Sequence, residues 1–282
     1  MNKLVVIIPT DLKDPFYIKR IIASLDIIHN INIVVVNQSK NDNLTNHIVP
    51  KKAVILNEIK TKEIVPLSVA RNMALTYLYE NYDDSMKNTL TLFADDDAWY
   101  PEETLHFLLT ADIKSYAIQT VDPLNNKSFV KSRFNSSEIK GHRLITDICS
   151  ICLIVPFQCL KQLNLVFNER VGLGNTISQG EESIFIYALN LAGIKIYGKN
   201  YFVYHPYKKT FNKRNFYSLA YFFSYGFHHI SKSMFFIPYT KNIVKYTVAG
   251  LLFIKDRRYI SLFKQVWKGT IDGSKNSENI YF

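Results

Sequence analysis

Asp95, Asp96 and Asp97 are three consecutive carboxylates in this 282-residue sequence. Their chemistry is the easiest to infer from residue type and spacing. Adjacent carboxylates repel one another, and a bound cation relieves that repulsion. Hard divalent ions are commonly held by one or two carboxylates together with substrate phosphates. The spacing of Asp95 and Asp97 suits such an ion. The alternative is a solvated turn that caps a helix starting near Pro101, because acidic residues stabilise helix N-termini.

A second pair of carboxylates, Glu181 and Glu182, follows Gly180 at the predicted start of a helix. A carboxylate in such a place can act as a general base toward a hydroxyl group. The alternative is simple stabilisation of the helix dipole. The preceding glycines, Gly172 and Gly174, predict a flexible loop. They do not form a phosphate-binding loop, because no Lys-Ser/Thr pair follows them.

Cys149 and Cys152 have the spacing of a C-x-x-C motif. No second ligand pair follows at the spacing of a zinc site. The surrounding residues 147–156 are mostly apolar and predict a strand. We therefore expect both cysteines to pack in the core, rather than to bind zinc or to undergo redox chemistry.

The elements that must position these side chains alternate between strands and helices. Apolar runs predict buried strands at residues 4–8, 31–36, 53–56 and 89–94, and a further strand ends at Tyr204. Helical spacing predicts helices at residues 18–28, 66–79 and 182–191. Such alternation indicates an α/β fold with a mainly parallel sheet covered by helices on both faces. Ligands of such sheets bind beyond the carboxyl ends of the strands, where the aspartates and residues 37–39 lie.

Seven segments, in order along the chain, are similar to a known family. They are LVVIIPT (4–10), IVVVNQS (33–39), PLSVARNMAL (66–75), FADDDAWYPEE (93–103), FNERVGLG (167–174), GEESIF (180–185) and GIKIYGKNYFVYHP (193–206). Together they resemble the family 2 glycosyltransferases with the GT-A fold, of the type that builds bacterial surface polysaccharides. The resemblance covers about residues 3–206. It implies a mixed, mainly parallel Rossmann-like sheet, with a nucleotide-sugar half at about 1–100 and an acceptor half at about 101–206.

The resemblance also implies a metal site and a donor site. Asp95 and Asp97 match the D-x-D element that holds Mn²⁺ or Mg²⁺ on the donor diphosphate, and His205 matches a histidine that completes the metal site. An imidazole ligand suits Mn²⁺ better than Mg²⁺; the alternative for His205 is a cap on a strand end. The implied donor-binding residues are Pro9, Thr10, Asn37, Gln38, Ser39, Arg71, Asp95 and Asp96. Arg71 is expected to contact phosphate or base, with an exposed helix arginine as the alternative.

One departure from the family concerns the nucleobase. Relatives usually end the second strand with an acidic D-D-G-S or D-N-G-S sequence, whereas this chain has Asn37, Gln38 and Ser39. An amide can donate and accept hydrogen bonds, so Gln38 can still pair with a pyrimidine edge. We therefore favour a UDP-sugar donor and leave dTDP- and GDP-sugars open.

By the same resemblance, Glu182 is the catalytic base and Glu181 orients the acceptor. A single displacement would invert the anomeric configuration. We expect sugar transfer of the hexosyltransferase type to a glycan or lipid-linked oligosaccharide in surface polysaccharide (capsule) synthesis. One alternative is a nucleotidyltransferase, although the glycine-rich loop typical of that class is missing after the first strand. The other is a non-catalytic binding or scaffold protein on the same fold.

The net charge of +10 lies entirely in residues 207–282, which contain 13 basic and 3 acidic residues and 19 of the 39 aromatic residues. We expect a helical tail here that associates with an anionic membrane surface or forms a homodimer interface. Its longest apolar stretch has nine residues, fewer than the ~20 needed to cross a bilayer. A nucleic-acid surface is disfavoured, because no recognition motif accompanies the charges.

The overall composition, 48% hydrophobic and 21% charged, is that of a globular protein and excludes disordered and collagen-like classes. Three cysteines cannot form a disulfide framework, which indicates a reducing compartment. The short N-terminal apolar run is interrupted by Pro9 and does not match a signal peptide. We therefore expect a cytoplasmic enzyme that associates peripherally with the inner face of the cell membrane.

Overall fold

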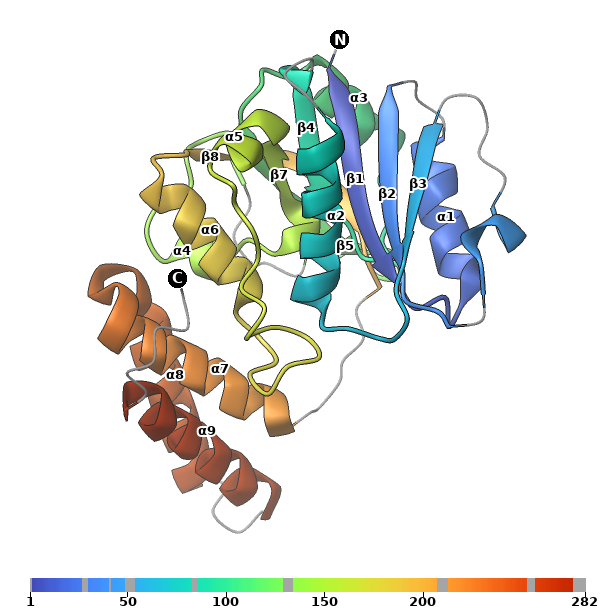
Figure 1. Ribbon diagram of the computed structural model, residues 1–282. Helices are drawn as coiled ribbons and strands as arrows, with labels where there is room; N and C mark the ends of the chain where they lie inside the picture. Colours follow the sequence, from blue (N-terminus) through green and yellow to red (C-terminus); the bar gives the residue numbers. More distant parts are fainter. Residues whose placement is uncertain are drawn as a thin grey trace.

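The structure is a computed structural model that describes residues 2–26, 30–40, 42–48, 54–82, 86–128, 134–206, 213–252 and 257–275. One mixed sheet runs through the body of the molecule in the order β3-β2-β1-β4-β7-β5-β6, with β8 paired to β5 (Figure 1). Helix α2 lies in front of this sheet in Figure 1, and α1 and α3 lie behind it. The core is therefore a sheet between two helical layers, as the sequence predicts.

Parallel strands form the first half of the sheet. They are β1 (Lys3–Thr10), β2 (Ile31–Asn37), β3 (Val54–Lys60) and β4 (Thr89–Phe93). β1 pairs in parallel with β2 and β4, and β3 pairs in parallel with β2. β1, β2 and β4 are buried on both faces, and such strands are mainly apolar, which is why they could be predicted from their sequence. β3 lies at the edge of the sheet and is partly exposed. Residue 53, the predicted start of the third strand, lies outside the described residues.

The helices of this half also match the prediction. α1 (Pro15–Leu25) begins after Asp14, whose side chain accepts a hydrogen bond from the Phe16 N–H, and a 3₁₀ turn covers Leu44–Asn46. Residue 28, predicted to extend α1, lies outside the described residues. α2 (Leu67–Asn81) begins directly after Pro66. Proline is well tolerated there, because the first backbone N–H groups of a helix have no intrahelical partner.

The second half of the sheet mixes both strand directions. β7 is antiparallel to β4 and β5, β6 is antiparallel to β5, and β8 is parallel to β5. Its strands are β5 (Ser115–Asp122), β6 (Lys127–Ser128), β7 (Leu153–Pro156) and β8 (Ile196–Tyr204). The helices of this half are α3 (Glu102–Thr110), α4 (Arg143–Thr146), α5 (Phe157–Gln162) and α6 (Glu181–Leu191).

The predicted strand over residues 147–156 is wrong in its first half. Ser150–Cys152 form a 3₁₀ turn, and β7 begins only at Leu153. The turn is closed by the Cys149 N–H, which donates to the Cys152 sulfur, and by the Cys152 thiol, which donates to the Cys149 carbonyl. Cys152 is buried and Cys149 is half-buried, so the cysteines pack inside the protein at a turn rather than along a strand.

The basic tail is helical, with α7 (Lys213–Tyr225), a π-helical turn (Gly226–Ile230), α8 (Lys232–Leu252) and α9 (Arg257–Lys275). These helices lie below α6 in Figure 1. α7 connects the tail to the body, because the ring of Phe222 packs directly on Gly180. A Cβ added to Gly180 would lie only 2.6 Å from the nearest carbon of that ring. The Ser218 hydroxyl also forms hydrogen bonds with Ser178. Among the described residues, no helix has both the length and the hydropathy to cross a membrane.

Candidate active site

A cleft of about 420 Å³ lies at the carboxyl ends of β1, β2 and β4. Its walls combine acidic, basic and apolar side chains. They are Pro9, Thr10, Asp11, Lys13, Gln38, Ile64, Val65, Leu67, Asp95, Asp96, Asp97, Leu173, Gly174 and His205. The cleft thus brings together most of the donor- and metal-binding residues predicted from the sequence, although they come from separate segments of the chain. This is the edge of the sheet at which α/β proteins bind their ligands.

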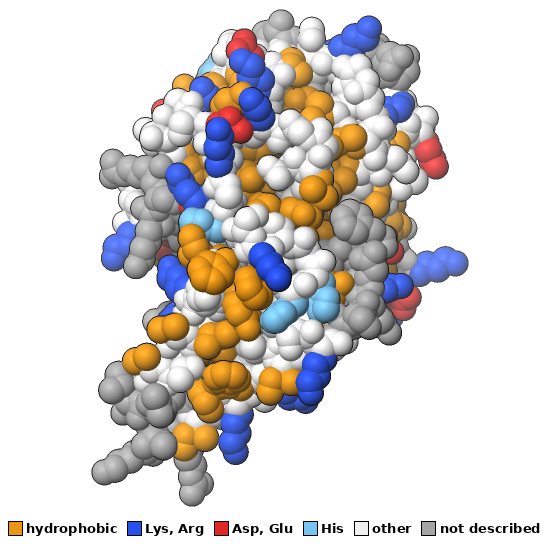
Figure 2. Space-filling view, turned by 90° about the vertical axis from the view of Figure 1, so that its left-hand side faces the viewer, with side chains coloured by type: hydrophobic (Ala, Val, Ile, Leu, Met, Phe, Trp, Pro, Cys, Tyr) orange, Lys and Arg blue, Asp and Glu red, His pale blue; other side chains and the backbone are white. Residues whose placement is uncertain are grey.

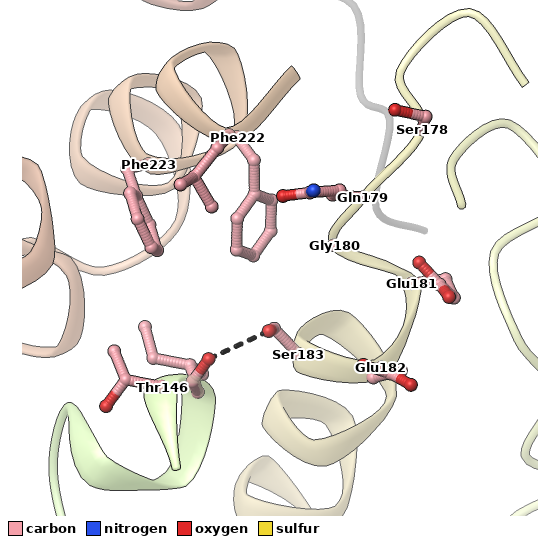
Figure 3. A pocket seen from close by; sticks show the side chains of 11 residues that line it. Thr146, Ser178, Gln179, Gly180, Glu181, Glu182, Ser183, Phe222 and Phe223 are labelled. Carbon is pink, nitrogen blue, oxygen red and sulfur yellow. Dashed lines mark hydrogen bonds between the residues drawn. The ribbon is translucent and has the colours of Figure 1, made fainter. Parts of the chain in front are cut away.

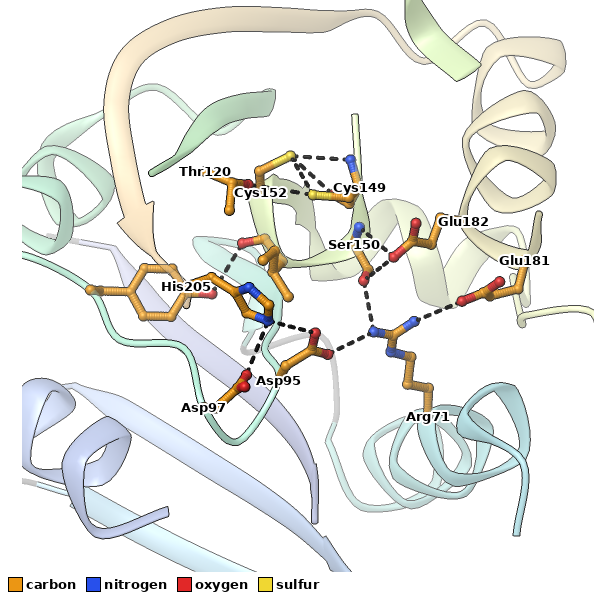
Figure 4. Close-up of polar contacts among 12 residues, drawn as sticks. Arg71, Asp95, Asp97, Thr120, Cys149, Ser150, Cys152, Glu181, Glu182 and His205 are labelled. Carbon is orange, nitrogen blue, oxygen red and sulfur yellow. Dashed lines mark hydrogen bonds and ion pairs between the residues drawn. The ribbon is translucent and has the colours of Figure 1, made fainter. Parts of the chain in front are cut away.

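Asp95, Asp97 and His205 meet in this cleft (Figure 4). His205 Nε2 lies 3.0 Å from Asp97 Oδ1 and 3.6 Å from Asp95 Oδ2. One ligand atom from each residue lies within 4.8 Å of the others. Two carboxylate oxygens and one imidazole nitrogen are donors that suit Mn²⁺, and carboxylates also suit Mg²⁺. The three side chains therefore fit a divalent cation.

The electrostatics of this group also favour a cation. Burial lowers the pKa of His205, but hydrogen bonds to Asp95 and Asp97 and the charges of both outweigh it and raise that pKa to about 10. Burial raises the pKa of Asp95, but the hydrogen bond to His205 and the charge of Arg71 outweigh it, so the net pKa is lowered. A protonated imidazole thus balances part of the carboxylate charge here, and a divalent ion held through His205 Nε2 would replace its proton.

Two residues that were not singled out from the sequence, Trp99 and Arg20, hold Asp97 and His205 in place. Trp99 and Tyr204 exchange backbone hydrogen bonds of 3.0 and 2.9 Å, which ties the end of β8, and with it His205, to the segment after Asp97. Arg20 from α1 donates to the Asp97 carbonyl at 2.6 Å, and its guanidinium lies 3.6 Å from the centre of the Trp99 ring. Trp99 stands inside the DDDAWY segment, but no local pattern pairs it with Arg20.

Asp96 faces a different partner from its two neighbours. Thr10 Oγ1 donates to Asp96 Oδ2 at 2.6 Å. Burial and the charges of Asp97 and Asp95 raise the pKa of Asp96 despite that hydrogen bond. The three consecutive aspartates therefore divide into a pair that fits a metal ion, Asp95 and Asp97, and one carboxylate that is hydrogen-bonded to Thr10 at the end of β1.

The three residues after β2 separate into two environments. Asn37 is fully buried, and its side-chain N–H groups donate to Glu58 Oε1 and to the Asp42 carbonyl. Its oxygen accepts from the Ser39 N–H. Neither Asn37 nor Ser39 lines the cleft, contrary to the expectation for a donor contact, because these hydrogen bonds turn them into the loop that follows β2. Gln38 does line the cleft, and its Oε1 accepts from the Val65 N–H at 2.8 Å.

Arg71 is likewise not part of the cleft wall and is fully buried, which excludes an exposed helix arginine. Its contact with a donor phosphate or base stays a prediction. Its Nη2 donates to Asp95 Oδ1 at 3.2 Å and to Ser150 Oγ at 2.7 Å (Figure 4). Its Nη1 lies 3.9 Å from Glu181 Oε1. The guanidinium thus connects Asp95 to Glu181, at a position outside the wall of the cleft.

The two glutamates at the start of α6 have distinct partners. Glu182 Oε1 accepts from the Ser150 N–H at 3.0 Å and from Ser150 Oγ at 2.6 Å. Glu181 is 7% exposed and lies against Gly172, where an added Cβ would be 2.8 Å from Glu181 Cδ. Burial and the charge of Glu182 raise the pKa of Glu181 to about 7, against the opposing charge of Arg71. A carboxyl group with such a pKa can exchange a proton near neutral pH.

The loop before α6 connects these glutamates to the cleft. Gly172 packs against Glu181, while Leu173 and Gly174, the next two residues, line the cleft itself. Gly172 and Gly174 both have positive φ, a backbone conformation that residues with a side chain rarely adopt. The loop therefore spans the distance between the two sets of carboxylates.

A second cavity of about 360 Å³ lies between α4, the start of α6 and α7 (Figure 3). Its described walls include Thr146, Gln179 and Ser183 from the body and Phe222 and Phe223 from α7. Glu181 and Glu182 also line this cavity, although their carboxylates point away from its centre in Figure 3. The cavity shares no wall residue with the cleft that holds the aspartates, and neither glutamate lines that cleft.

Comparison with known proteins identifies the fold. No protein-family model matches the sequence, and no curated protein matches it. Among solved structures 256 chains match. One is the crystal structure of GalNAc-T7 with UDP, GalNAc and Mn²⁺, with a TM-score of 0.51 and 9% identity. The match covers 80% of this chain and 50% of that one, so this chain spans about half the length of that protein. The likeness shows the GT-A fold, as predicted from the sequence.

Proposed function

We propose that this protein is an inverting, metal-dependent glycosyltransferase of family 2 that uses a nucleotide-sugar donor. The observation that carries the proposal is the group of Asp95, Asp97 and His205 in a cleft at the carboxyl ends of the parallel strands. GalNAc-T7, which has the same fold, was crystallised with a nucleotide, a sugar and Mn²⁺. That combination supports a donor site of the same chemical kind here.

Asp95, Asp97 and His205 would hold Mn²⁺ or Mg²⁺. The ion supplies stabilisation for the negative charge that develops on the diphosphate leaving group. Thr10 and Asp96 close the end of the cleft next to this group, and Lys13 is a cation in its wall that can meet a phosphate. Arg71 lies outside the cleft wall, next to Asp95. Its charge and its hydrogen bond keep the Asp95 carboxylate ionised and oriented.

Glu182 is the proposed base that takes the proton from the acceptor hydroxyl. Its carboxylate is held by two hydrogen bonds from Ser150, which leave Oε2 for the acceptor. Glu181 would orient the acceptor. One displacement step, with the hydroxyl entering opposite the leaving diphosphate, inverts the anomeric configuration.

The favoured donor is a UDP-sugar, with dTDP- and GDP-sugars as alternatives. Gln38 lines the cleft and is the proposed contact for the base. Because its oxygen already accepts from the Val65 N–H, the side-chain N–H groups are the natural donors to a pyrimidine carbonyl.

The proposed acceptor is a glycan or a lipid-linked oligosaccharide in surface polysaccharide synthesis, reached at the inner face of the cell membrane through the tail. Helix α8 exposes Phe236, Ile237, Val244 and Val248 together with several lysines. Figure 2 shows hydrophobic and basic side chains side by side on the lower, tail part of the molecule. Such a surface suits anionic lipid headgroups. A homodimer interface is the competing use of the same surface.

Calorimetric titration with UDP, dTDP and GDP, each with Mn²⁺ and with a chelator, tests the donor site. We expect one nucleotide, UDP, to bind with metal and to lose that binding with the chelator and in Asp97→Asn. Sugar conjugates of that nucleotide are then assayed for transfer, and NMR of the first product reports its anomeric configuration. Retention would contradict the single displacement. Absence of binding by all three nucleotides would overturn the donor site and favour a scaffold protein.

A further inference from the structure

Cys149 and Cys152 form a close thiol pair inside the protein. Their sulfur atoms are 3.5 Å apart, in contact but not bonded. The Cys149 N–H donates to the Cys152 sulfur at 3.2 Å, and the Cys152 thiol donates to the Cys149 carbonyl at 3.1 Å. A disulfide needs sulfur atoms about 2.05 Å apart. The two sulfur atoms would therefore have to move about 1.5 Å closer to form a disulfide. The turn already holds the two side chains next to each other, so rotation of these side chains can bring the sulfur atoms together.

The residue between these cysteines holds the two parts of the candidate active site together. Ser150 is 1% exposed, and its Oγ accepts from Arg71 Nη2 and donates to Glu182 Oε1. Its N–H donates to the same carboxylate oxygen. A disulfide removes the thiol proton of Cys152, and with it the hydrogen bond to the Cys149 carbonyl that helps to close the turn. A shift of the turn after that loss would move the hydrogen bonds by which Ser150 orients Glu182 and Arg71.

We propose that Cys149 and Cys152 are a redox-active dithiol whose oxidation to a disulfide by a peroxide displaces Ser150 and slows sugar transfer. The effect on transfer rests on the proposed function, but the chemistry of the thiol pair does not. In the first step the Cys149 thiolate attacks one peroxide oxygen, the O–O bond breaks, and a sulfenic acid forms. In the second step the Cys152 sulfur displaces water from it. The two thiols lose two electrons and two protons, and the peroxide is reduced to water.

Several observations support Cys149 as the attacking sulfur. Cys149 is the less buried residue of the two. When Cys149 ionises, the Cys152 thiol can turn from the Cys149 carbonyl and donate to the Cys149 sulfur 3.5 Å away. This hydrogen bond lowers the pKa of the Cys149 thiol despite burial, which favours the reactive thiolate. Thr120 Oγ1 lies 3.4 Å from the same sulfur. In a reducing compartment such a pair is thiol at rest and disulfide only under oxidation.

The covalent step is tested by mass spectrometry on the full chain in a Cys159→Ser background, which removes the third, half-buried cysteine. The protein is treated with hydrogen peroxide, alkylated with N-ethylmaleimide under denaturing conditions and digested. We expect the peptide with residues 149–152 to lose two hydrogens, to resist alkylation, and to recover both thiols with dithiothreitol. Cys149→Ser and Cys152→Ser must each abolish this species. Two alkylated thiols after peroxide treatment, or irreversible sulfonic acid alone, would overturn the proposal.

The coupling to the site is tested by hydrogen exchange and by transfer assays on the same oxidised sample. We expect faster amide exchange at residues 149–152 and at the start of α6. We also expect transfer to be slowed at least about tenfold, since small misplacements of catalytic groups are costly. Both effects should be absent in Cys149→Ser/Cys152→Ser. A disulfide that changes neither exchange nor transfer would refute the coupling. If the reduced protein transfers no sugar at all, the proposed function fails, while mass and exchange still decide the redox site.

Discussion

Ser150 shows how much of the site depends on one small side chain. Its hydroxyl is the shared partner of a buried guanidinium and a half-buried carboxylate. Removing it would leave Arg71 Nη2 and Glu182 Oε1 each short of a hydrogen bond, and such losses typically cost about 1–3 kcal/mol. We predict that Ser150→Ala lowers kcat for sugar transfer about tenfold or more and leaves metal-dependent UDP binding within about twofold, because Ser150 does not line the cleft.

A matched control for Ser150→Ala is Ser183→Ala. Ser183 is also buried and its hydroxyl donates to a backbone carbonyl, that of Ile145, rather than to a catalytic group. Steady-state kinetics and calorimetry on both variants separate the two effects. An equal loss of kcat in both variants would indicate general destabilisation rather than positioning of Glu182.

Glu181 gives the protein a characteristic dependence of stability on pH. Its pKa is about 7 in the folded protein against an ordinary value of 4.5, mainly because of burial. Between those values the folded state keeps a proton that the unfolded state has lost, so the contribution of Glu181 to stability is present at low pH and is lost as the pH rises through 7. The difference of about 2.5 pH units corresponds to roughly 3 kcal/mol.

We therefore predict that Glu181→Gln, which cannot ionise, becomes more stable relative to the wild type as the pH rises from 5 to 8, by up to roughly 3 kcal/mol. Urea unfolding in the presence of a chelator at several pH values measures this. Glu103→Gln, at an exposed position in α3, is the control and should follow the wild type at every pH. Parallel stability curves for Glu181→Gln and the wild type would contradict the raised pKa.

At the scale of elements, the sequence was most informative where burial is simplest. The strands β1, β2 and β4 are apolar because both faces are covered, so their positions and the acidic end of β4 could be predicted. The burial of Arg71 could also have been predicted, from the positions of its apolar neighbours on the helix. Arg71 lies four and seven residues before Leu75 and Leu78, which are both fully buried on α2, so its helix face pointed into the core.

Ser150 and Arg20, by contrast, could not be predicted. Ser150 meets Arg71 across 79 positions of sequence, and Arg20 meets Asp97 across 77. Such contacts depend on how the sheet places α1, α2 and the turn before β7, and no local period encodes that. The same limit explains the wrong first half of the strand predicted at residues 147–156, where the composition is apolar but hydrogen bonds to sulfur close a turn.

Helices α7 and α9 pack so closely that side chains are excluded between them. A Cβ on Gly269 would lie 2.4 Å from the Tyr217 carbonyl oxygen, and a Cβ on Gly273 would lie 2.4 Å from that of Tyr221. Both contacts are with backbone, which cannot rotate away. We predict that Gly269→Ala and Gly273→Ala each destabilise the tail by about 1–3 kcal/mol, although alanine favours an isolated helix.

Trp267 of α9 provides a fluorescence signal for urea unfolding of these variants. Lys264→Ala, at an exposed position of the same helix, changes helix propensity without entering the contact and should be neutral or stabilising. If the glycine variants were as stable as Lys264→Ala, the close packing of α7 against α9 would be refuted.

At the scale of the whole molecule, the neutral body and the basic tail divide the work of the proposed enzyme. The cleft with the aspartates lies in the body, and α7 fixes the tail to the segment just before the glutamates through Phe222 on Gly180 and Ser218 on Ser178. A membrane-bound tail would therefore hold the start of α6 at a fixed distance from the lipid surface. This arrangement suits an acceptor that is itself anchored in that surface.

We predict that the protein sediments with vesicles containing anionic lipid, that binding weakens with salt, and that Phe236→Ser/Val244→Ser reduces it at least about tenfold. Apolar insertion and lysine charges both contribute, with each lysine worth about 1 kcal/mol near such a surface. Phe16→Ser is the control, since Phe16 is 60% exposed but belongs to α1 of the body. Sedimentation velocity without lipid tests the alternative, a homodimer interface. If the wild type is a dimer that the same double variant dissociates, and the wild type does not bind vesicles, the exposed face of α8 belongs to a contact with a second copy of the chain.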